Sequence, residues 1–182
     1  MNPNISSLIA GRPKFTDPQW EHAARTESPE AAWRMAFTTA GFQALHQVQG
    51  GFAVAVPLQD GRVFMAVDRF GIEPLCYRLQ AGSLHFAQRA DALADSNTPI
   101  DPQALFDYLY HHVIPSPRTV FQRVMRLPPG HYALFDQGRL TVAPYWEPDF
   151  APARNPGPFA QWREEFIGLL QGAVRKTPHR PN

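Results

Sequence analysis

The sequence predicts an α+β fold in which helices pack on an antiparallel sheet. A helix signal stands at Ser28, followed by Pro29-Glu30, and apolar residues then recur at helical spacing as far as Val48. Short apolar runs come next, and the dipeptide Asp60-Gly61 between two of them is a strong hairpin signal. Strands joined by such tight turns pair antiparallel, so we expect a meander lying under the preceding helix.

The N-terminal elements are predicted to be a short strand and two helices. Residues 7–11 form the strand, which is expected to be buried. Thr16 or Asp17 can cap the first helix, which has proline at its first position. The second helix is predicted over 29–47 as an amphipathic segment with a break near Gly41.

The β structure is predicted in six segments, at 51–57, 62–67, 75–79, 83–87, 131–135 and 139–145, and the last two form a hairpin around Asp136-Gln137-Gly138. The first four of these are expected to bury Phe52, Val54, Phe64, Ala66 and Phe86 under the helix. A short helix is predicted at 88–95. Another opens at Asp101-Pro102, and its expected apolar face consists of Leu105, Phe106, Leu109 and Tyr110.

The C-terminal part differs in composition. After Trp146 the chain becomes rich in proline and alanine over 148–158, which is typical of a semi-rigid linker. An amphipathic helix is predicted at 159–175. We therefore expect one domain over 1–146 and a linker with a helix over 147–182.

Composition and charge exclude several classes of function. The chain has 182 residues, enough for one domain, and a net charge of +1 with scattered Lys and Arg, which implies no nucleic-acid partner. Its single cysteine, Cys76, excludes an internal disulfide and a cysteine-rich metal site. No apolar run approaches a membrane span and the N-terminus lacks a signal-peptide pattern, so we expect a cytoplasmic protein without a membrane partner.

Four ordered blocks carry a resemblance to a known family. Residues 68–75, D-R-F-G-I-E-P-L, resemble the D-R-x-G-x-x-P-L signature of the amidotransferase domain in glutamine-dependent asparagine synthetases. Residues 50–56 are similar to the family's G-x-F-A-F-A strand, 114–121 to its P-x-P-x-T-[IV]-F segment and 126–132 to its L-P-P-G-H motif. The resemblance implies a class II amidotransferase-like antiparallel sandwich of the N-terminal-nucleophile type, in truncated form.

Eight residues form the structural signature that this resemblance defines: Asp68, Arg69, Gly71, Pro74, Pro128, Pro129, Gly130 and His131. Asp68 and Arg69 are expected to satisfy backbone groups and each other in the turn. Gly71 is expected to supply a positive φ and His131 to fix its loop against a neighbour.

The family's glutaminase groups have no clear counterpart. The family attacks glutamine with an N-terminal cysteine whose free α-amine is the base, whereas Asn2 follows Met1 here. Aligning 7–11 with the family's C-G-I-A-G start puts Ser7 at the nucleophile position, behind six residues. Aligning 8–15 with the strand after the family's N-G-E-I-Y-N loop fits the spacing better, and the first layer of the sandwich is then lost.

No residue is assigned to catalysis, to a cofactor or to a metal. Cys76 has no obvious base in the sequence, so we expect a buried packing role. The adjacent His111 and His112 diverge on a helix and cannot chelate as an i, i+4 pair does. No glycine-rich phosphate loop is found, so ATP and Mg²⁺ are expected only in a synthetase partner or a missing domain.

Three hypotheses about function remain. In the first, the chain is a catalytically silent amidotransferase-like scaffold that supports a synthetase or cyclase through residues 115–175, as in β-lactam synthetase and lasso-peptide cyclase relatives. In the second, it still hydrolyses glutamine, through Ser7 or an unrecognised group. In the third, it is a fragment of a longer ligase without a role of its own. We also keep the formation of a homodimer as an alternative.

Overall fold

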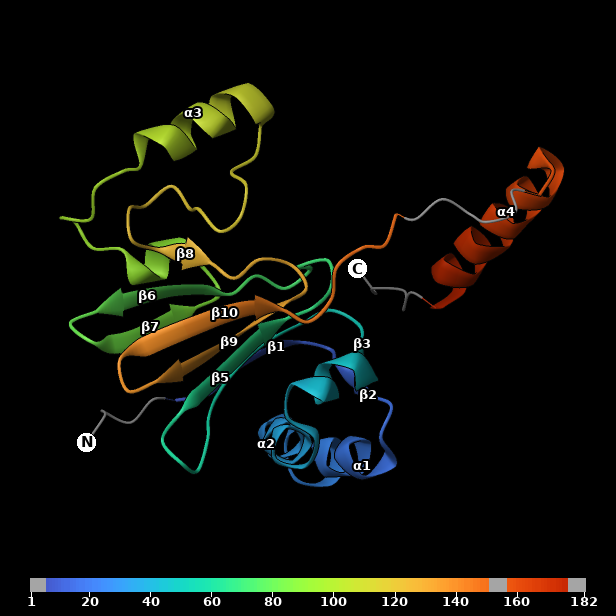
Figure 1. Cartoon of the computed structure of the whole chain (residues 1–182), viewed down its shortest axis with the longest axis horizontal. Coiled ribbons are helices and arrows are strands. Elements are labelled where there is room, and N and C mark those ends of the chain that lie inside the picture. Colours follow the sequence, from blue (N-terminus) through green and yellow to red (C-terminus); the bar gives the residue numbers. More distant parts are fainter. Residues whose placement is uncertain (1–5, 151–156, 177–182) are drawn as a thin grey trace, which may run out of the picture. The chain divides into compact units, whose positions relative to one another are not determined.

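A five-stranded antiparallel sheet forms the centre of the first unit, Met1–Glu147, in the computed structural model, which describes residues 6–150 and 157–176 (Figure 1). Its strand order is β1 (Leu8–Gly11), β4 (Phe52–Pro57), β5 (Val63–Val67), β9 (His131–Asp136) and β10 (Arg139–Pro144). The hairpins predicted at Asp60-Gly61 and around Gly138 join β4 to β5 and β9 to β10. Both local turn signals are therefore confirmed.

A second, three-stranded sheet corrects the predicted meander. It has the order β7 (Ser83–Ala87), β6 (Cys76–Gln80) and β8 (Met125–Arg126). One edge of β5 pairs with β4 and the other pairs with β9, a strand from the far end of the unit. The next strand, β6, therefore does not continue this sheet, and the chain after β5 crosses to the other sheet. Phe86 accordingly packs in the core between the two sheets, whereas the sequence pattern predicted it under the helices.

The helix layer follows local capping signals. Asp17 Oδ1 accepts from the amides of Gln19 and Trp20 and starts α1 (Pro18–Thr26). Ser28 Oγ accepts from the Ala31 amide and starts α2 (Pro29–Ala40). The predicted break is confirmed at Gly41, where φ is 56° and the 3₁₀ helix η1 (Gly41–Gln47) begins.

Alternation along the central strands builds two cores. Phe52, Val54 and Val56 face the helices, whereas Ala53 and Ala55 face the three-stranded sheet. Because both faces are covered, β4 and β5 are continuously apolar in sequence. The layers are thus helices, five-stranded sheet and three-stranded sheet, and the α+β antiparallel sandwich with helices on the sheet is confirmed (Figure 1). The two-residue strands β2 (Lys14–Phe15) and β3 (Val48–Gln49) pair beside the helices.

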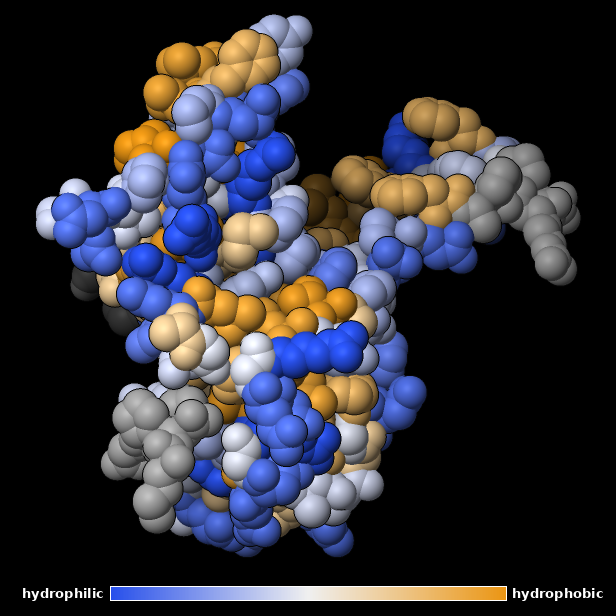
Figure 2. Space-filling view, turned by 60° about the vertical axis from the view of Figure 1, so that its left-hand side comes forward, coloured by the Kyte–Doolittle hydropathy of each residue, from blue (hydrophilic) through white to orange (hydrophobic). Residues whose placement is uncertain are grey.

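The helix α3 (Pro102–His111) forms where it was predicted, but its apolar residues are not in a core. Asp101 caps it, and Ala104 is its one buried residue. The side chains of its predicted apolar face are exposed, with 59% of Phe106 and 69% of Leu109 accessible. Apolar side chains accordingly gather on the surface over α3 (Figure 2). The predicted helix at 88–95 is a single 3₁₀ turn, η2 (Ala90–Leu93).

The second unit, Pro148–Asn182, contains the helix α4 (Phe159–Lys176), as predicted. Most of the predicted linker, at 151–156, lies outside the described residues. The large apolar side chains of α4 are exposed: Phe159, Trp162, Phe166, Ile167, Leu169, Leu170 and Val174. Among the described residues, no helix has the length and apolar character needed to cross a membrane.

Candidate functional site

The signature turn, residues 68–75, is organised by one buried carboxylate. Asp68 is 2% exposed. Its Oδ1 accepts from the amides of Phe70 at 2.9 Å and Ile72 at 3.2 Å. Its Oδ2 accepts from those of Phe52 and Glu73, each at 3.2 Å. The carboxylate therefore closes the turn and ties it to the start of β4.

We expected Asp68 and Arg69 to pair with each other, but none of these four bonds involves the Arg69 side chain. All four bonds of the Asp68 carboxylate within the described part of the chain go to backbone amides. Arg69 is half-buried, and its Nε is buried without a hydrogen-bond partner. The prediction that Asp68 satisfies backbone groups is confirmed by these bonds.

The signature turn interlocks with the second motif, residues 126–132. The amide of Gly130 donates to the Asp68 carbonyl at 2.9 Å. Gly71 has φ 64°, and a Cβ there would lie 3.0 Å from Cγ of Pro129. Gly130 has φ 68°, and a Cβ there would lie 2.5 Å from the carbonyl oxygen of Trp146. The positive φ favours glycine at both positions, and at Gly130 the close approach of a backbone carbonyl excludes a Cβ unless the backbone shifts.

The end of β10 covers this junction. The hydroxyl of Tyr145 donates to the Val67 carbonyl at 2.9 Å, just before the turn. Burial, helped by the nearby Asp68 carboxylate, raises the pKa of Tyr145 well above its ordinary value. The ring of Phe70 meets that of Trp146 edge-on, with centroids 5.4 Å apart. Three other segments, the start of β4, residues 126–132 and the end of β10, therefore converge on the turn.

A hollow of about 390 Å³ opens beside the turn. Its lining consists of Val48, Gln49, Gly50, Phe52, Asp68, Arg69, Phe70 and Ile72. Arg69 is the cation of this lining, and none of the lining residues carries a hydroxyl or thiol nucleophile. The hollow can thus hold a small polar ligand, but its lining offers no group that would attack one.

Ser7 lies apart from this hollow, just before β1. Its hydroxyl hydrogen-bonds the carboxylate of Glu30 in the first turn of α2. Arg34 pairs with Glu30 at 2.8 Å and, together with Ser7, lowers the pKa of that carboxyl. A carboxylate with a lowered pKa is a weak base, so this pair is poorly suited to activating the hydroxyl.

The remaining candidates are also apart from one another. Cys76 is buried at the start of β6, where burial raises the pKa of its thiol. Nδ1 of His131 lies 2.8 Å from the Pro129 carbonyl, so the ring contacts its own loop. His111 ends α3, and His112 follows it in a left-handed conformation. Within 6–150 and 157–176, no group of three His, Cys, Asp or Glu side chains could hold a metal ion.

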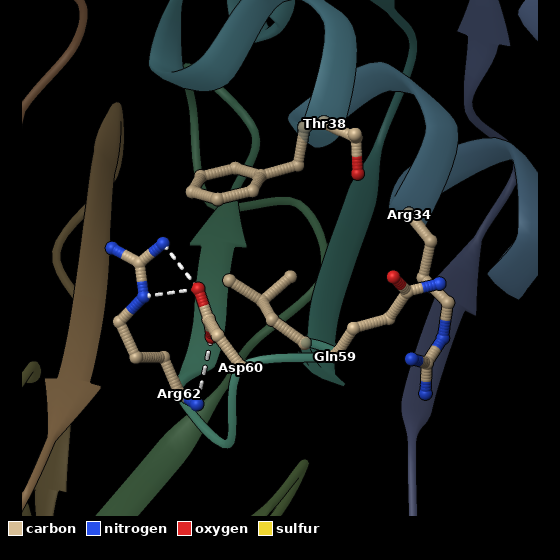
Figure 3. Close-up of a pocket in the computed structure, with 7 residues that line it drawn as sticks. Arg34, Thr38, Gln59, Asp60 and Arg62 are labelled. Carbon is tan, nitrogen blue, oxygen red and sulfur yellow. Dashed lines mark hydrogen bonds and ion pairs between the residues drawn. The ribbon is translucent and has the colours of Figure 1, made fainter.

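A second hollow, of about 350 Å³, was not predicted from the sequence (Figure 3). It lies between α2 and the β4–β5 turn, and Arg34 and Arg62 line it from opposite sides. Arg62 pairs with Asp60, which lowers the pKa of that carboxyl, and Arg34 pairs with Glu30. Both arginines are therefore already balanced by carboxylates, and no motif in the sequence marks the place.

Comparison with known proteins identifies the family. The sequence model of the glutamine amidotransferase domain matches residues 16–146. The chain is 31% identical over 147 residues to the Mycobacterium bovis protein named "Putative asparagine synthetase (glutamine-hydrolyzing)", a match that covers 75% of the chain and 22% of that protein. It is 28% identical over 117 residues to asparagine synthetase 1 (glutamine-hydrolyzing) of Bacillus subtilis, covering 62% and 18%.

The chain therefore belongs to the glutamine amidotransferase domain family, in its asparagine-synthetase-like class II form. It spans about a fifth of the length of these relatives. Among solved structures, the glutamine phosphoribosylpyrophosphate amidotransferase of Bacillus subtilis, complexed with ADP and GMP, matches with a TM-score of 0.47 and 13% identity. That match covers 80% of this chain and 30% of the enzyme.

The glycine junction gives a first prediction. Gly130→Ala must adopt a left-handed conformation, at about 1–2 kcal/mol, and also displace the Trp146 carbonyl, at a further ~1–3 kcal/mol. Gly61→Ala is the matched control, because its φ is 86° but a Cβ there meets nothing within 4 Å. Urea unfolding should therefore show the larger loss for Gly130→Ala. Equal losses would mean that the junction yields without strain.

The buried tyrosine gives a prediction about pH. Because the folded pKa of Tyr145 is raised, its stabilising effect is complete below the ordinary tyrosine value and declines as pH rises above about 10, by at most ~1.4 kcal/mol per pH unit. Tyr145→Phe should lower stability by about 1 kcal/mol at pH 8 and make the decline above pH 10 shallower. Tyr77 and Cys76, whose pKa values burial also raises, contribute to the slope that remains.

Urea unfolding at pH 8, 10 and 11 measures this slope. Tyr110→Phe is the control, because Tyr110 is 71% exposed and should leave the slope unchanged. A Tyr145→Phe protein with the wild-type slope would contradict the prediction.

Proposed function

We propose that the chain is a non-catalytic, scaffold-type amidotransferase domain that supports an asparagine-synthetase-like, ATP-dependent amide-forming ligase. One observation carries this proposal: the signature residues are engaged in holding backbone segments together. Asp68 binds four amides, and Gly71 and Gly130 allow two loops to touch. These contacts preserve the fold whether or not glutamine is hydrolysed.

The candidate nucleophiles support the same proposal. The Ser7 hydroxyl contacts a carboxylate whose pKa is lowered, and the Cys76 thiol has a raised pKa. A thiol with a raised pKa is mostly protonated at neutral pH and is then a weak nucleophile. Neither side chain lines the hollow beside the signature turn.

The partner that we propose is a synthetase or lasso-peptide-cyclase-like domain, which would bind ATP and Mg²⁺ in the cytoplasm. The interface was expected in residues 115–175, and the exposed apolar side chains of α4 lie in that range. The exposed apolar side chains of α3 come shortly before it in sequence. Exposed apolar surface of this kind is typical of protein-protein contacts.

Glutamine hydrolysis is the second candidate, because the names of both relatives contain it. An assay of ammonia release from glutamine, with and without ATP, decides between the two. We expect no release above a heat-inactivated control, and no difference between the wild type and the Ser7→Ala and Cys76→Ala variants. Release that is lost in either variant would establish a glutaminase and overturn the scaffold proposal.

Docking is tested separately, by gel filtration of the full chain mixed with a synthetase domain of the asparagine-synthetase type from the same organism. The double variant Phe106→Glu/Leu109→Glu places charges on exposed positions of α3, so it should weaken the complex by at least about tenfold without loss of stability. Leu79→Glu, at a 41% exposed apolar position on β6 and outside 115–175, is the control. A complex unaffected by the double variant would exclude α3 from the interface.

A further inference from the structure

Cys76 and Arg126 share one face of the three-stranded sheet. They are direct partners in the antiparallel pairing of β6 with β8, so their side chains project to the same side. The neighbouring pair, Tyr77 and Met125, faces the core between the two sheets. Arg126 and Cys76 therefore lie on the outer face, away from the five-stranded sheet.

The positive charge of Arg126 has no carboxylate to balance it. Arg126 is half-buried, and its Nε is buried without a hydrogen-bond partner. Within the described part of the chain, its guanidinium contacts the Cys76 thiol and forms no ion pair. Burial raises the pKa of that thiol, so the sulfur stays neutral at pH 7 and supplies no counter-charge. A partly buried cation without an anion is costly unless a ligand completes it.

A hollow of about 400 Å³ lies at this place. Its walls are mostly apolar and include Pro74, Ala90, Val120 and Phe121. Arg89 and Asp91 also line it, and they pair with each other through two bonds of 3.0 and 2.8 Å. The remaining unbalanced charge of the lining is that of Arg126.

We propose that this hollow binds a monocarboxylate with an apolar body, with the carboxylate on the guanidinium of Arg126 and the body against Phe121. One unbalanced guanidinium matches one negative charge, and Asp91 would repel the second charge of a phosphate dianion. The apolar walls favour an organic acid over an inorganic anion. Glutamine hydrolysis does not require this site. Val120, Phe121 and Arg126 lie within the range 115–175 proposed for docking, but the test below uses the chain without a synthetase, so the two proposals can fail separately.

The test is a titration followed by NMR of arginine Nε–H groups, with benzoate as the probe and benzamide as its uncharged analogue. Benzoate should shift the Arg126 resonance in a saturable way, with a Kd on the order of 1 mM, and benzamide should not. Arg126→Gln, whose titration is followed at the Nε–H of Arg89 in the same hollow, should weaken binding by at least about tenfold. Arg139→Gln, at an exposed position on β10, should leave it unchanged.

A second ligand distinguishes the source of the carboxylate. An acetylated tripeptide that ends in a free phenylalanine carboxylate represents the C-terminus of a protein partner. If it binds more tightly than benzoate, the site serves a protein carboxylate, and if benzoate binds more tightly, it serves a free acid. Both outcomes support the proposal.

Three results would overturn the proposal: no shift up to about 50 mM benzoate, equal binding of benzamide, or wild-type affinity in Arg126→Gln. If Arg126→Gln fails to fold, Arg126→Lys replaces it, because lysine keeps the charge but loses the two-pronged geometry and should bind more weakly. The comparison of benzoate with benzamide in the wild type decides the matter without any variant.

Discussion

The buried carboxylate of Asp68 is the interaction on which the rest of the structure depends. It accepts from amides on both sides of the crossing between the two sheets, at Phe52 in the five-stranded sheet and at Phe70, Ile72 and Glu73 in the turn that leads to the other. A buried amide left without an acceptor costs about 1–3 kcal/mol, so four such donors make this carboxylate hard to replace. The Gly130 amide then joins the second motif to the Asp68 carbonyl.

This arrangement separates the architecture of the domain from its chemistry. The junction needs an acceptor at Asp68 and closely approaching backbones at Gly71 and Gly130, and none of these has to touch a substrate. These contacts do not involve Ser7 or Cys76. The lowered pKa of Glu30 beside Ser7 and the raised pKa of the Cys76 thiol are both unfavourable to nucleophilic attack.

The features that stability does not require lie on the outside of the unit. Exposed apolar side chains on α3 gain nothing from folding, and an unbalanced guanidinium at Arg126 opposes it. Such features bring a folded domain little benefit unless a partner or a ligand covers them. The apolar α3 surface is suited to a protein partner, whereas the hollow beside Arg126 is suited to a small carboxylate.

The sequence by itself determined the local elements and the family. Helix starts at Asp17, Ser28 and Asp101 and hairpins at Gly61 and Gly138 were predictable, because a cap or a tight turn depends on residues within a few positions of each other. The tertiary structure alone decided that β5 pairs with β9, that the apolar side of α3 is exposed, and that Arg126 lines a hollow. These depend on contacts between segments far apart in the chain, for which a local pattern carries no signal.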